Sequence, residues 1–360
     1  METPGAFGDA RKCKCYAAKA ASEPLEAWEI ERRGVGARDV GIDIRWSGIC
    51  HSDIHCARNE WFQGLFPLVP GHEIAGVVAA VGPEVTKFKA GDKVGVGVFV
   101  DSCRECDKCR QGREQYCLKG KVGTYGAKFP YPHCAEMGAT TYGGYSQYIV
   151  CDESYALRIP DNLDLAASAP LLCAGITTWS PLMFYGAQAN SKVAVAGLGG
   201  LGHMAVKFAV ALGAHTTVLS RSEVKREEAL GLLGAHAFVN TKTAKAEPDS
   251  FDLIIDTISA DHDLDALLSL VKPDGGNLCL VGLPPDKISV KPFSFVGQRK
   301  ILSGSCIGGI KETQDMLDFC GRHNITCLVE KINARQINMA FDRAVDSDVK
   351  YRFVIDASSF

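Results

Sequence analysis

Two patterns of apolar and polar residues divide the chain near residue 160. Before this point, short apolar runs are separated by turn residues such as Gly82-Pro83 and Gly143-Gly144. The runs predict strands at residues 15–19, 39–46, 74–81, 93–100 and 144–150. Short strands broken by glycine and proline are typical of an antiparallel domain. The first part of the chain is therefore predicted to be rich in β-structure.

After residue 160, apolar strands alternate with helical segments. Strands are predicted at 191–196, 215–219, 237–239, 253–256 and 277–281, and helices at 203–212, 224–233 and 264–270. This alternation predicts a parallel, doubly wound sheet. A helix at 310–320 and a strand at 353–355 follow, and we expect this last part to return to the first domain. The expected segments are 1–160, 161–305 and 306–360.

Charge and hydropathy exclude several classes of partner. The chain of 360 residues has a formal net charge of −3, which favours neither a nucleic-acid partner nor an anionic membrane surface. Its most apolar stretch, residues 193–212, contains glycines, His203 and Lys207 and does not suit a membrane span. The residues after Met1 lack the basic and apolar regions of a secretory signal. We therefore expect a cytoplasmic protein without a membrane partner.

Four of the fifteen cysteines lie close together in the sequence. They are Cys103, Cys106, Cys109 and Cys117, spaced C-x2-C-x2-C-x7-C. A chain of this size without a secretory signal does not suggest a disulfide framework. Four thiolates on a short loop can surround one zinc ion and close its coordination shell. We therefore predict a structural zinc site; unrelated thiols or an iron–sulfur cluster are the alternatives, but nothing else suggests electron transfer.

A glycine-rich turn follows the predicted strand 191–196 and opens the predicted helix 203–212. It reads Gly197-Leu198-Gly199-Gly200-Leu201-Gly202, which matches the dinucleotide-binding pattern G-x-G-x-x-G. Gly197 permits the tight turn, Gly199 lets the backbone approach a pyrophosphate, and Gly202 lets helix and strand pack closely. The helix N-terminus favours the negative charge of the phosphates. The turn therefore predicts a dinucleotide cofactor.

The end of the second strand in this region distinguishes NAD from NADP. An NAD site usually carries an acidic residue there, about twenty residues after the glycine turn. This chain has Ser220-Arg221-Ser222 and then Lys225. No acid stands at the end of the strand to repel a 2′-phosphate, and these side chains can donate hydrogen bonds to it. The sequence favours NADP(H); an exposed basic turn that binds no phosphate is the alternative.

Two earlier segments contain further metal-binding residue types. They are Gly48-Ile49-Cys50-His51-Ser52-Asp53-Ile54-His55 and Gly71-His72-Glu73. A cysteine and a histidine this far apart are weak evidence by themselves. The order of these segments, the four-cysteine segment and the glycine turn resembles that of zinc-containing medium-chain alcohol dehydrogenases. Within that family the chain is most similar to the cinnamyl alcohol dehydrogenase group, from about residue 16 to residue 355.

The resemblance implies an α/β fold, with a β-rich GroES-like catalytic domain and a doubly wound, parallel-sheet (Rossmann) nucleotide-binding domain. Residues 1–160 and 306–360 would form the catalytic domain, and 161–305 the nucleotide-binding domain. The implied enzyme is a zinc-dependent oxidoreductase that transfers a hydride between NADP(H) and a primary alcohol or aldehyde, aromatic or medium-chain. It would hold two zinc ions per chain and form a homodimer.

The resemblance also implies a catalytic zinc site made by Cys50, His72 and Cys173. Two thiolates and one imidazole leave a fourth position for water or a substrate oxygen. Glu73 resembles a carboxylate that lies behind the metal or ligates it when substrate is absent. Asp53 resembles the carboxylate that orients the ligand histidine. A role as a small buried apolar residue is the alternative for Cys173.

The remaining implied roles concern the proton and the cofactor. The alcohol proton would pass to the Ser52 hydroxyl, then through the cofactor ribose to His55, whose ordinary pKa lies near working pH. A serine and a histidine exposed without a shared role are the alternative. Thr177 resembles a contact of the nicotinamide, and Val281 and Ser305 resemble backbone positions near its carboxamide.

Two other functions fit the same fold. One is an NADPH-dependent reductase of an iminium or conjugated C=C bond, and the other is a catalytically silent nucleotide-binding relative. Relatives with those roles often lose a zinc ligand, the relay hydroxyl or the relay histidine. This chain retains Cys50, His72 and Cys173 together with Ser52 and His55, which favours the dehydrogenase.

Overall fold

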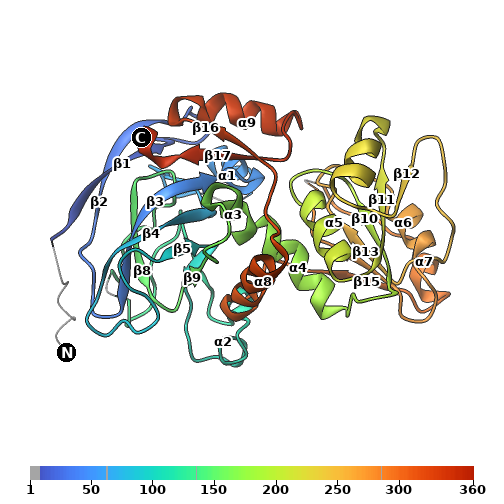
Figure 1. The fold of residues 1–360 in the computed structure, drawn as a ribbon, viewed down its shortest axis with the longest axis horizontal. Helices are drawn as coiled ribbons and strands as arrows, with labels where there is room; N and C mark the ends of the chain where they lie inside the picture. The colour runs from blue at the N-terminus through green and yellow to red at the C-terminus, as the bar shows by residue number, and fades with distance from the viewer. Residues whose placement is uncertain (1–8, 62–63, 135, 285) are drawn as a thin grey trace. The chain divides into compact units, whose positions relative to one another are not determined.

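The computed structural model describes residues 9–61, 64–134, 136–284 and 286–360. The chain separates into two units. The first consists of Met1–Cys173 and Gly308–Phe360, and the second of Ala174–Ile307. Each unit is described by itself below (Figure 1).

A seven-stranded, mainly antiparallel sheet forms the centre of the first unit. Its strands lie in the order β16-β17-β3-β4-β5-β9, with β8 also paired to β3. The bounds are β3 (Asp39–Gly48), β4 (Ile74–Val81), β5 (Lys93–Val96), β8 (Tyr148–Asp152), β9 (Ala156–Arg158), β16 (Val329–Ile332) and β17 (Arg352–Asp356). Two-stranded sheets are formed by β1 (Arg11–Ala17) with β2 (Glu26–Arg32), and by β6 (Phe99–Asp101) with β7 (Val122–Gly123). Because β17 pairs with β3, residues near 350 complete a sheet that begins near residue 40.

Alternation along the strands explains which face is buried. In β3, Val40, Ile42 and Ile44 contribute to the same apolar cluster because every second side chain of a strand points to the same face. The helices of this unit are α1 (His51–Ala57), α2 (Asp107–Arg110), α3 (Leu165–Ser168), α8 (Ile310–His323) and α9 (Ile337–Val345). Short 3-10 turns lie at Glu114–Tyr116, Ala169–Leu172, Ala334–Gln336 and Ala357–Ser359.

The second unit is a six-stranded parallel sheet in the order β12-β11-β10-β13-β14-β15. The strands are β10 (Lys192–Ala196), β11 (His215–Ser220), β12 (Ala237–Asn240), β13 (Leu253–Asp256), β14 (Asn277–Leu280) and β15 (Ile301–Gly304). The helices are α4 (Ala174–Phe184), α5 (Gly202–Ala211), α6 (Leu264–Leu270) and α7 (Phe293–Val296). In Figure 1, α5 and α6 lie on either side of the strands.

This strand order is that of the doubly wound dinucleotide-binding fold. The order reverses between β10 and β13, so the crevice at their carboxyl ends is the expected binding edge. The fold class predicted from the sequence is confirmed for both units: a β-rich unit and a parallel, doubly wound unit.

Several expected element boundaries are wrong. The strand expected at 93–100 is interrupted at Gly97, where a Cβ would lie 3.2 Å from the Leu172 carbonyl oxygen. The strands expected at 15–19 and 144–150 are instead β1 and β8, each shifted along the chain. The helix expected at 224–233 is present but irregular: a 3-10 helix at Glu223–Lys225 continues through two α-helical residues into a π-helix at Glu228–Leu232.

The irregularity of this helix has a physical cause. Gly231 weakens a regular α-helix, and the apolar side chains of Val224 and Leu232 are exposed, whereas Ala229 and Leu233 are buried.

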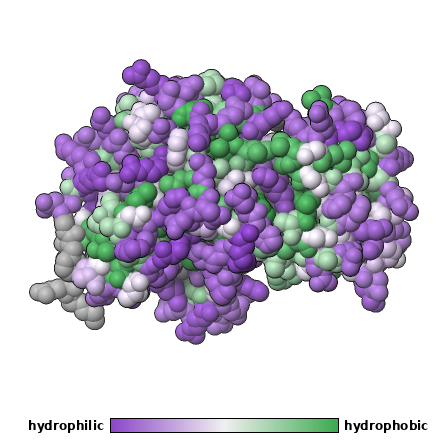
Figure 2. Space-filling view, in the orientation of Figure 1, coloured by the Kyte–Doolittle hydropathy of each residue, from purple (hydrophilic) through white to green (hydrophobic). Residues whose placement is uncertain are grey.

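Hydrophilic residues cover most of the face visible in Figure 2. No single helix in the described part of the chain is long and apolar enough to cross a membrane. Two consecutive helical segments joined at a bend, Leu165–Leu172 and Ala174–Phe184, are together long and apolar enough for a broken span by length and composition alone.

Candidate metal and cofactor sites

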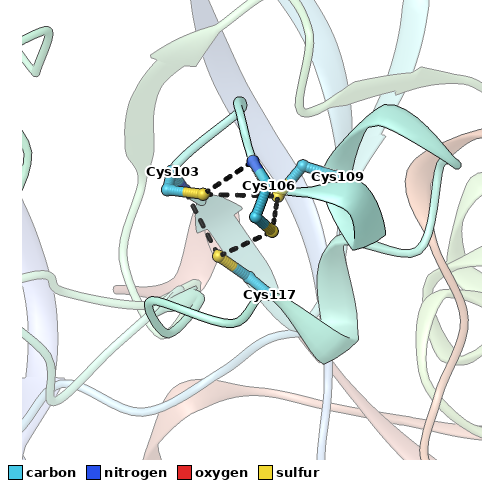
Figure 3. Close-up of side chains that lie close together, drawn as sticks. All are labelled: Cys103, Cys106, Cys109 and Cys117. Carbon is cyan, nitrogen blue, oxygen red and sulfur yellow. Dashed lines mark hydrogen bonds between the residues drawn. The ribbon is translucent and has the colours of Figure 1, made fainter.

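The four clustered cysteines bring their sulfur atoms together on one loop (Figure 3). The Sγ atom of Cys109 lies 3.8 Å from that of Cys103 and 3.5 Å from that of Cys106, and Cys106 lies 4.0 Å from Cys117. Four sulfurs at 2.3 Å from a tetrahedral zinc would be about 3.8 Å apart. The donor set and its spacing therefore fit a closed zinc site.

Backbone amides favour the charged form of these sulfurs. The Cys106 amide donates to Cys103, the Cys103 amide to Cys117, and the Leu118 amide to Cys106. Backbone hydrogen bonds, from Cys109 first and then Leu118, lower the pKa of Cys106 to about 6. These amides thus favour the thiolate form of Cys106 and Cys117, which is the form that binds zinc, whereas burial raises the pKa of Cys109 to about 12.

A second cluster contains Cys50, His72, Glu73 and Cys173, all buried, with ligand atoms within 4.8 Å of one another. The sheet explains how the first three meet. Ser47, near the end of β3, pairs with Ile74, the first residue of β4. Cys50 follows β3 and caps α1, and His72 and Glu73 precede β4, so both segments emerge at the same edge. The predicted catalytic ligands therefore converge.

The orientation of His72 also fits a metal site. Its Nδ1 atom lies 3.3 Å from Asp53 Oδ1, whereas its buried Nε2 atom has no hydrogen-bond partner among the described residues. Asp53 also accepts hydrogen bonds from the Cys50 and Gly71 amides and from the Tyr145 hydroxyl. A ligand histidine is commonly fixed in this way by a carboxylate on its other nitrogen. The unpaired Nε2 is thus the nitrogen available to zinc.

Arg352 is a residue of this cluster that the sequence reasoning missed. It lies at the start of β17, is buried, and forms an ion pair with Glu73. Burial raises the pKa of Glu73 to about 8 although Arg352 opposes the shift. The available signal was an arginine within the apolar run Tyr351–Ile355, where a charge is costly unless paired.

A hydrogen bond between the two thiols of the cluster moves their pKa values apart. A hydrogen bond from Cys173 lowers the pKa of Cys50 well below its usual value, and the same bond raises that of Cys173. Their sulfurs lie 3.9 Å apart. Burial lowers the pKa of His72, but Asp53 and then Cys50 raise it above its usual value overall.

Ser52 and His55, the predicted relay residues, lie one turn apart on α1. Ser52 Oγ is 3.4 Å from Cys50 Sγ. His55 Nδ1 lies 2.5 Å from a carboxylate oxygen of Glu60, and its ring stacks on Trp61 with centroids 4.6 Å apart. Glu60 was not predicted. It occupies one ring nitrogen of His55 and leaves the other as the one that can exchange a proton.

The glycine turn has the geometry that its pattern predicts. Gly197 has φ of +88°, and a Cβ at Gly202 would lie 2.2 Å from the Gly197 carbonyl oxygen. Gly199 differs, because a Cβ there would meet no protein atom within 4 Å. Helix α5 begins after Leu201 without a side-chain cap. The open space at Gly199 beside an uncapped helix N-terminus fits a cradle for phosphate; Gly200 lies in the same turn.

The turn after β11 carries the predicted 2′-phosphate contacts. Ser220 ends the strand and its Oγ accepts from the Ser222 amide at 3.2 Å. Arg221 is exposed, and no hydrogen bond or ion pair involves it in the described part of the chain. Lys225 Nζ donates to the Leu198 carbonyl at 2.5 Å, so it connects this turn to the glycine turn.

The acidic residue nearest to this turn, Glu223, is engaged by other side chains. Glu223 pairs with Arg226 and accepts a hydrogen bond from Asn240 at 3.0 Å.

The other predicted cofactor contacts belong to the second unit. Thr177 is buried in α4, Val281 directly follows β14, and Ser305 directly follows β15. The Val281 amide donates to the Asp256 carbonyl, and the Ser305 amide to the Leu280 carbonyl. The two backbone positions therefore lie at the carboxyl ends of adjacent strands.

Comparisons with known proteins agree with both units. Residues 36–161 match the alcohol dehydrogenase GroES-like domain, and residues 200–322 match the zinc-binding dehydrogenase family. The chain is 55% identical to NADP-dependent alcohol dehydrogenase C 1 of Mycolicibacterium smegmatis, over 96% of this chain and 97% of the relative.

Solved structures are also similar. A cinnamyl alcohol dehydrogenase of Sorghum bicolor shares 43% identity and a TM-score of 0.91, over 97% of this chain and 98% of that chain. The cinnamyl alcohol dehydrogenase of Helicobacter pylori in complex with NADP(H) shares 44% identity and a TM-score of 0.90, over 98% and 100%. The chain therefore belongs to the zinc-containing medium-chain alcohol dehydrogenase family, in its cinnamyl alcohol dehydrogenase-like group.

Proposed function

We propose that the chain is a zinc-dependent oxidoreductase that transfers a hydride between NADP(H) and a primary alcohol or aldehyde. One observation carries the proposal most directly. His72 presents a buried nitrogen toward Cys50 and Cys173, and this nitrogen has no hydrogen-bond partner in the part of the chain that the structure describes. An imidazole nitrogen that is buried beside two thiols in this way fits a bound cation, which would complete its contacts.

Cys50, His72 and Cys173 would hold the catalytic zinc, with Glu73 able to take the remaining position. The four-cysteine loop would hold the second, structural ion. When bound, the catalytic ion stabilises negative charge on the substrate oxygen. Asp53 keeps the Nδ1 hydrogen of His72 engaged, so that Nε2 faces the ligands. Arg352 offsets part of the negative charge that the thiolates and Glu73 place in this buried region.

The chain also supplies the route for the alcohol proton. The Ser52 hydroxyl lies beside Cys50 and can accept the proton and pass on its own. His55 stands one turn later, with 27% of its side chain exposed. A histidine that is partly exposed and held by Glu60 can deliver a proton to solvent.

Activity toward aldehydes tests the proposed function. We expect NADPH oxidation to be faster with aryl or medium-chain aldehydes than with small ketones, because an aldehyde presents only hydrogen where a ketone presents a second substituent. Initial rates with a panel of purified substrates measure this order. Faster turnover of acetone-like ketones than of benzaldehyde-like substrates would contradict it. Reduction of an iminium or conjugated C=C substrate without any aldehyde activity would favour the alternative reaction.

Arg221 tests the preference for NADP(H). Its exposed guanidinium can hold a phosphate through two hydrogen bonds, which a neutral side chain cannot. Hydrogen bonds to charged groups contribute about 1.5–3 kcal/mol, so Arg221→Ala should weaken NADPH binding by roughly 10- to 150-fold. NADH lacks the 2′-phosphate, so its dissociation constant should change little.

The matched control for Arg221 is Arg226→Ala in the same segment. Arg226 is already paired with Glu223 and lies over the Phe238 ring, so its loss should leave both cofactors nearly unaffected. A wild-type preference for NADH, or an equal loss of affinity for both cofactors in Arg221→Ala, would show that this turn does not bind the 2′-phosphate.

We also infer a cytoplasmic homodimer, with residues 1–160 and 306–360 as the catalytic domain and 161–305 as the nucleotide-binding domain. Support for a dimer lies at the edge of the parallel sheet. There β15 is the last strand, and Ile301, Phe293 and Val296 nearby are exposed. An apolar sheet edge of this kind suits pairing with a second copy.

A further inference from the structure

A buried carboxylate and a histidine form a pair at the binding edge of the parallel sheet. Asp256 ends β13 and is fully buried, and His262 Nε2 lies 2.7 Å from its Oδ2 atom. His262 Nδ1 lies 2.8 Å from the Ala260 carbonyl oxygen. Only 12% of the His262 side chain is exposed. None of the roles described above uses this pair.

The partners of His262 determine its proton count. A backbone carbonyl can only accept, so Nδ1 carries a hydrogen. The Asp256 oxygen shares a proton with Nε2. The ring and the carboxylate together therefore satisfy both contacts only when His262 is doubly protonated or when the proton has moved to Asp256. Loss of one proton leaves one of the two hydrogen bonds without its hydrogen.

Asp256 is also the point at which two adjacent strand ends meet. Its backbone carbonyl accepts from the Val281 and Gly282 amides, both at 2.9 Å. Its Oδ1 atom accepts from the Ile258 amide at 3.0 Å. A change in the position of Asp256 would therefore reach Val281, one of the proposed backbone contacts of the nicotinamide carboxamide.

The loop that His262 closes, residues 257–263, packs against both sides of the crevice. Thr257 Oγ1 donates to the Ala196 carbonyl at 2.9 Å, and a Cβ at Gly197 would lie 2.8 Å from Thr257 Oγ1. On the other side, a Cβ at Gly282 would lie 2.3 Å from the Ile258 carbonyl oxygen. The glycine turn and the end of β14 therefore both lie in close contact with this loop, and neither glycine has room for a side chain.

We propose that His262 is a positioning residue for the cofactor: its protonated ring ties the loop 257–263 to Asp256 and so fixes the glycine turn and Val281 in the geometry that binds the dinucleotide. This inference rests on the proposed use of the edge for NADP(H). It predicts that cofactor affinity depends on one proton far from the 2′-phosphate.

The direction of the pH dependence follows from the charges around the ring. The hydrogen bond to Asp256 is the main reason that the pKa of His262 lies above its ordinary value. The carboxylate of Asp261 in the same loop acts in the same direction. In the described residues these two carboxylates are the charged groups that act on the ring. The stabilisation is therefore fully present below a pH of about 6.5 and is lost as the pH rises through the raised pKa.

The experiment measures dissociation constants of NADPH and NADH between pH 7 and pH 10 with the full-length, zinc-loaded protein. A 2′-phosphate has a second pKa of about 6, so it is ionised throughout this range. In the wild type we expect both cofactors to bind about 5-fold or more weakly at high pH, the lower end of ordinary coupling between sites. Deprotonation of Lys225, whose pKa burial lowers, would weaken NADPH alone.

Two variants separate positioning from folding. His262→Leu should weaken both cofactors at pH 7 by at least the same factor. His262→Gln keeps one donor but has no proton to lose, so its affinities should be intermediate and independent of pH. The control is His236→Gln in the same unit, because Nδ1 of His236 accepts from the Thr216 amide near the start of β11, away from the binding edge. It should bind both cofactors as the wild type does.

The outcomes are distinct. If His262→Leu lowers the melting temperature but binds both cofactors normally, the pair is only structural and the proposal is wrong. Should this variant not fold, a pH-independent NADH affinity in the wild type, or an unchanged pH profile in His262→Gln, would overturn it equally. Failure of the NADP(H) proposal looks different, because it would appear as a lack of NADPH binding at every pH.

Discussion

Cys173→Ser is expected to abolish turnover while leaving the protein folded. Cys173 is buried and its Sγ atom faces Cys50 at 3.9 Å, so a hydroxyl would replace one of two thiolates in a site with three firm ligands. Substitutions of residues that merely support a metal ligand reduce metal affinity or activity by about 10- to 100-fold, and loss of a ligand should exceed that. Metal analysis should find one zinc per chain in place of two.

The control for this prediction is Cys151→Ser. Cys151 lies in β8, is equally buried, and belongs to an apolar cluster rather than to either ligand set. It receives the same chemical change, so its zinc content and its turnover per folded molecule should stay near those of the wild type. Retention of two zinc ions and full activity in Cys173→Ser would remove Cys173 from the ligand set.

Ser52→Ala should slow turnover by about 10²- to 10⁴-fold, the usual contribution of a positioned proton-transfer group. The reason is that alanine removes the hydroxyl that would take the alcohol proton, whereas the zinc ligands and the cofactor turn are unchanged. Single-turnover rates measure the loss, and equilibrium titration checks that NADPH binding is retained.

Ser52→Thr is the informative companion, because it keeps a hydroxyl at the same position on α1. We expect it to recover most of the rate. A rate in Ser52→Ala within a factor of about two of the wild type would mean that the proton leaves by another route. Equal losses in the alanine and threonine variants would point to packing rather than proton transfer.

The local chemistry of this protein was largely readable from its sequence. The four cysteines lie within one short loop, so their spacing along the chain is nearly their spacing in space. The glycine turn is similar, because a strand, a turn and a helix N-terminus follow one another directly. In both cases a few neighbouring residues fix the geometry, and the pattern carries the information.

Residues that join distant segments were harder to predict. Arg352 reaches Glu73 only because β17 pairs with β3, and no local sequence pattern predicts that pairing. Glu60 contacts His55 after α1 has ended, where helix periodicity no longer applies. The segment near residue 228 is helical as predicted, but its irregular 3-10 and π geometry and the exposure of Leu232 did not follow from its apolar pattern. Tertiary packing, which the sequence does not display, decided each case.

The ion pair between Arg352 and Glu73 has a consequence for electroneutrality. Two thiolates and one carboxylate would bring three negative charges into a region from which water is excluded. A divalent ion and the guanidinium together supply three positive charges, so the group is neutral only when both are present. Asp53 is balanced separately, by the donors around it. A fragment that contained Cys50, His72, Glu73 and Cys173 but lacked β17 would therefore hold every ligand and still carry an unbalanced buried charge.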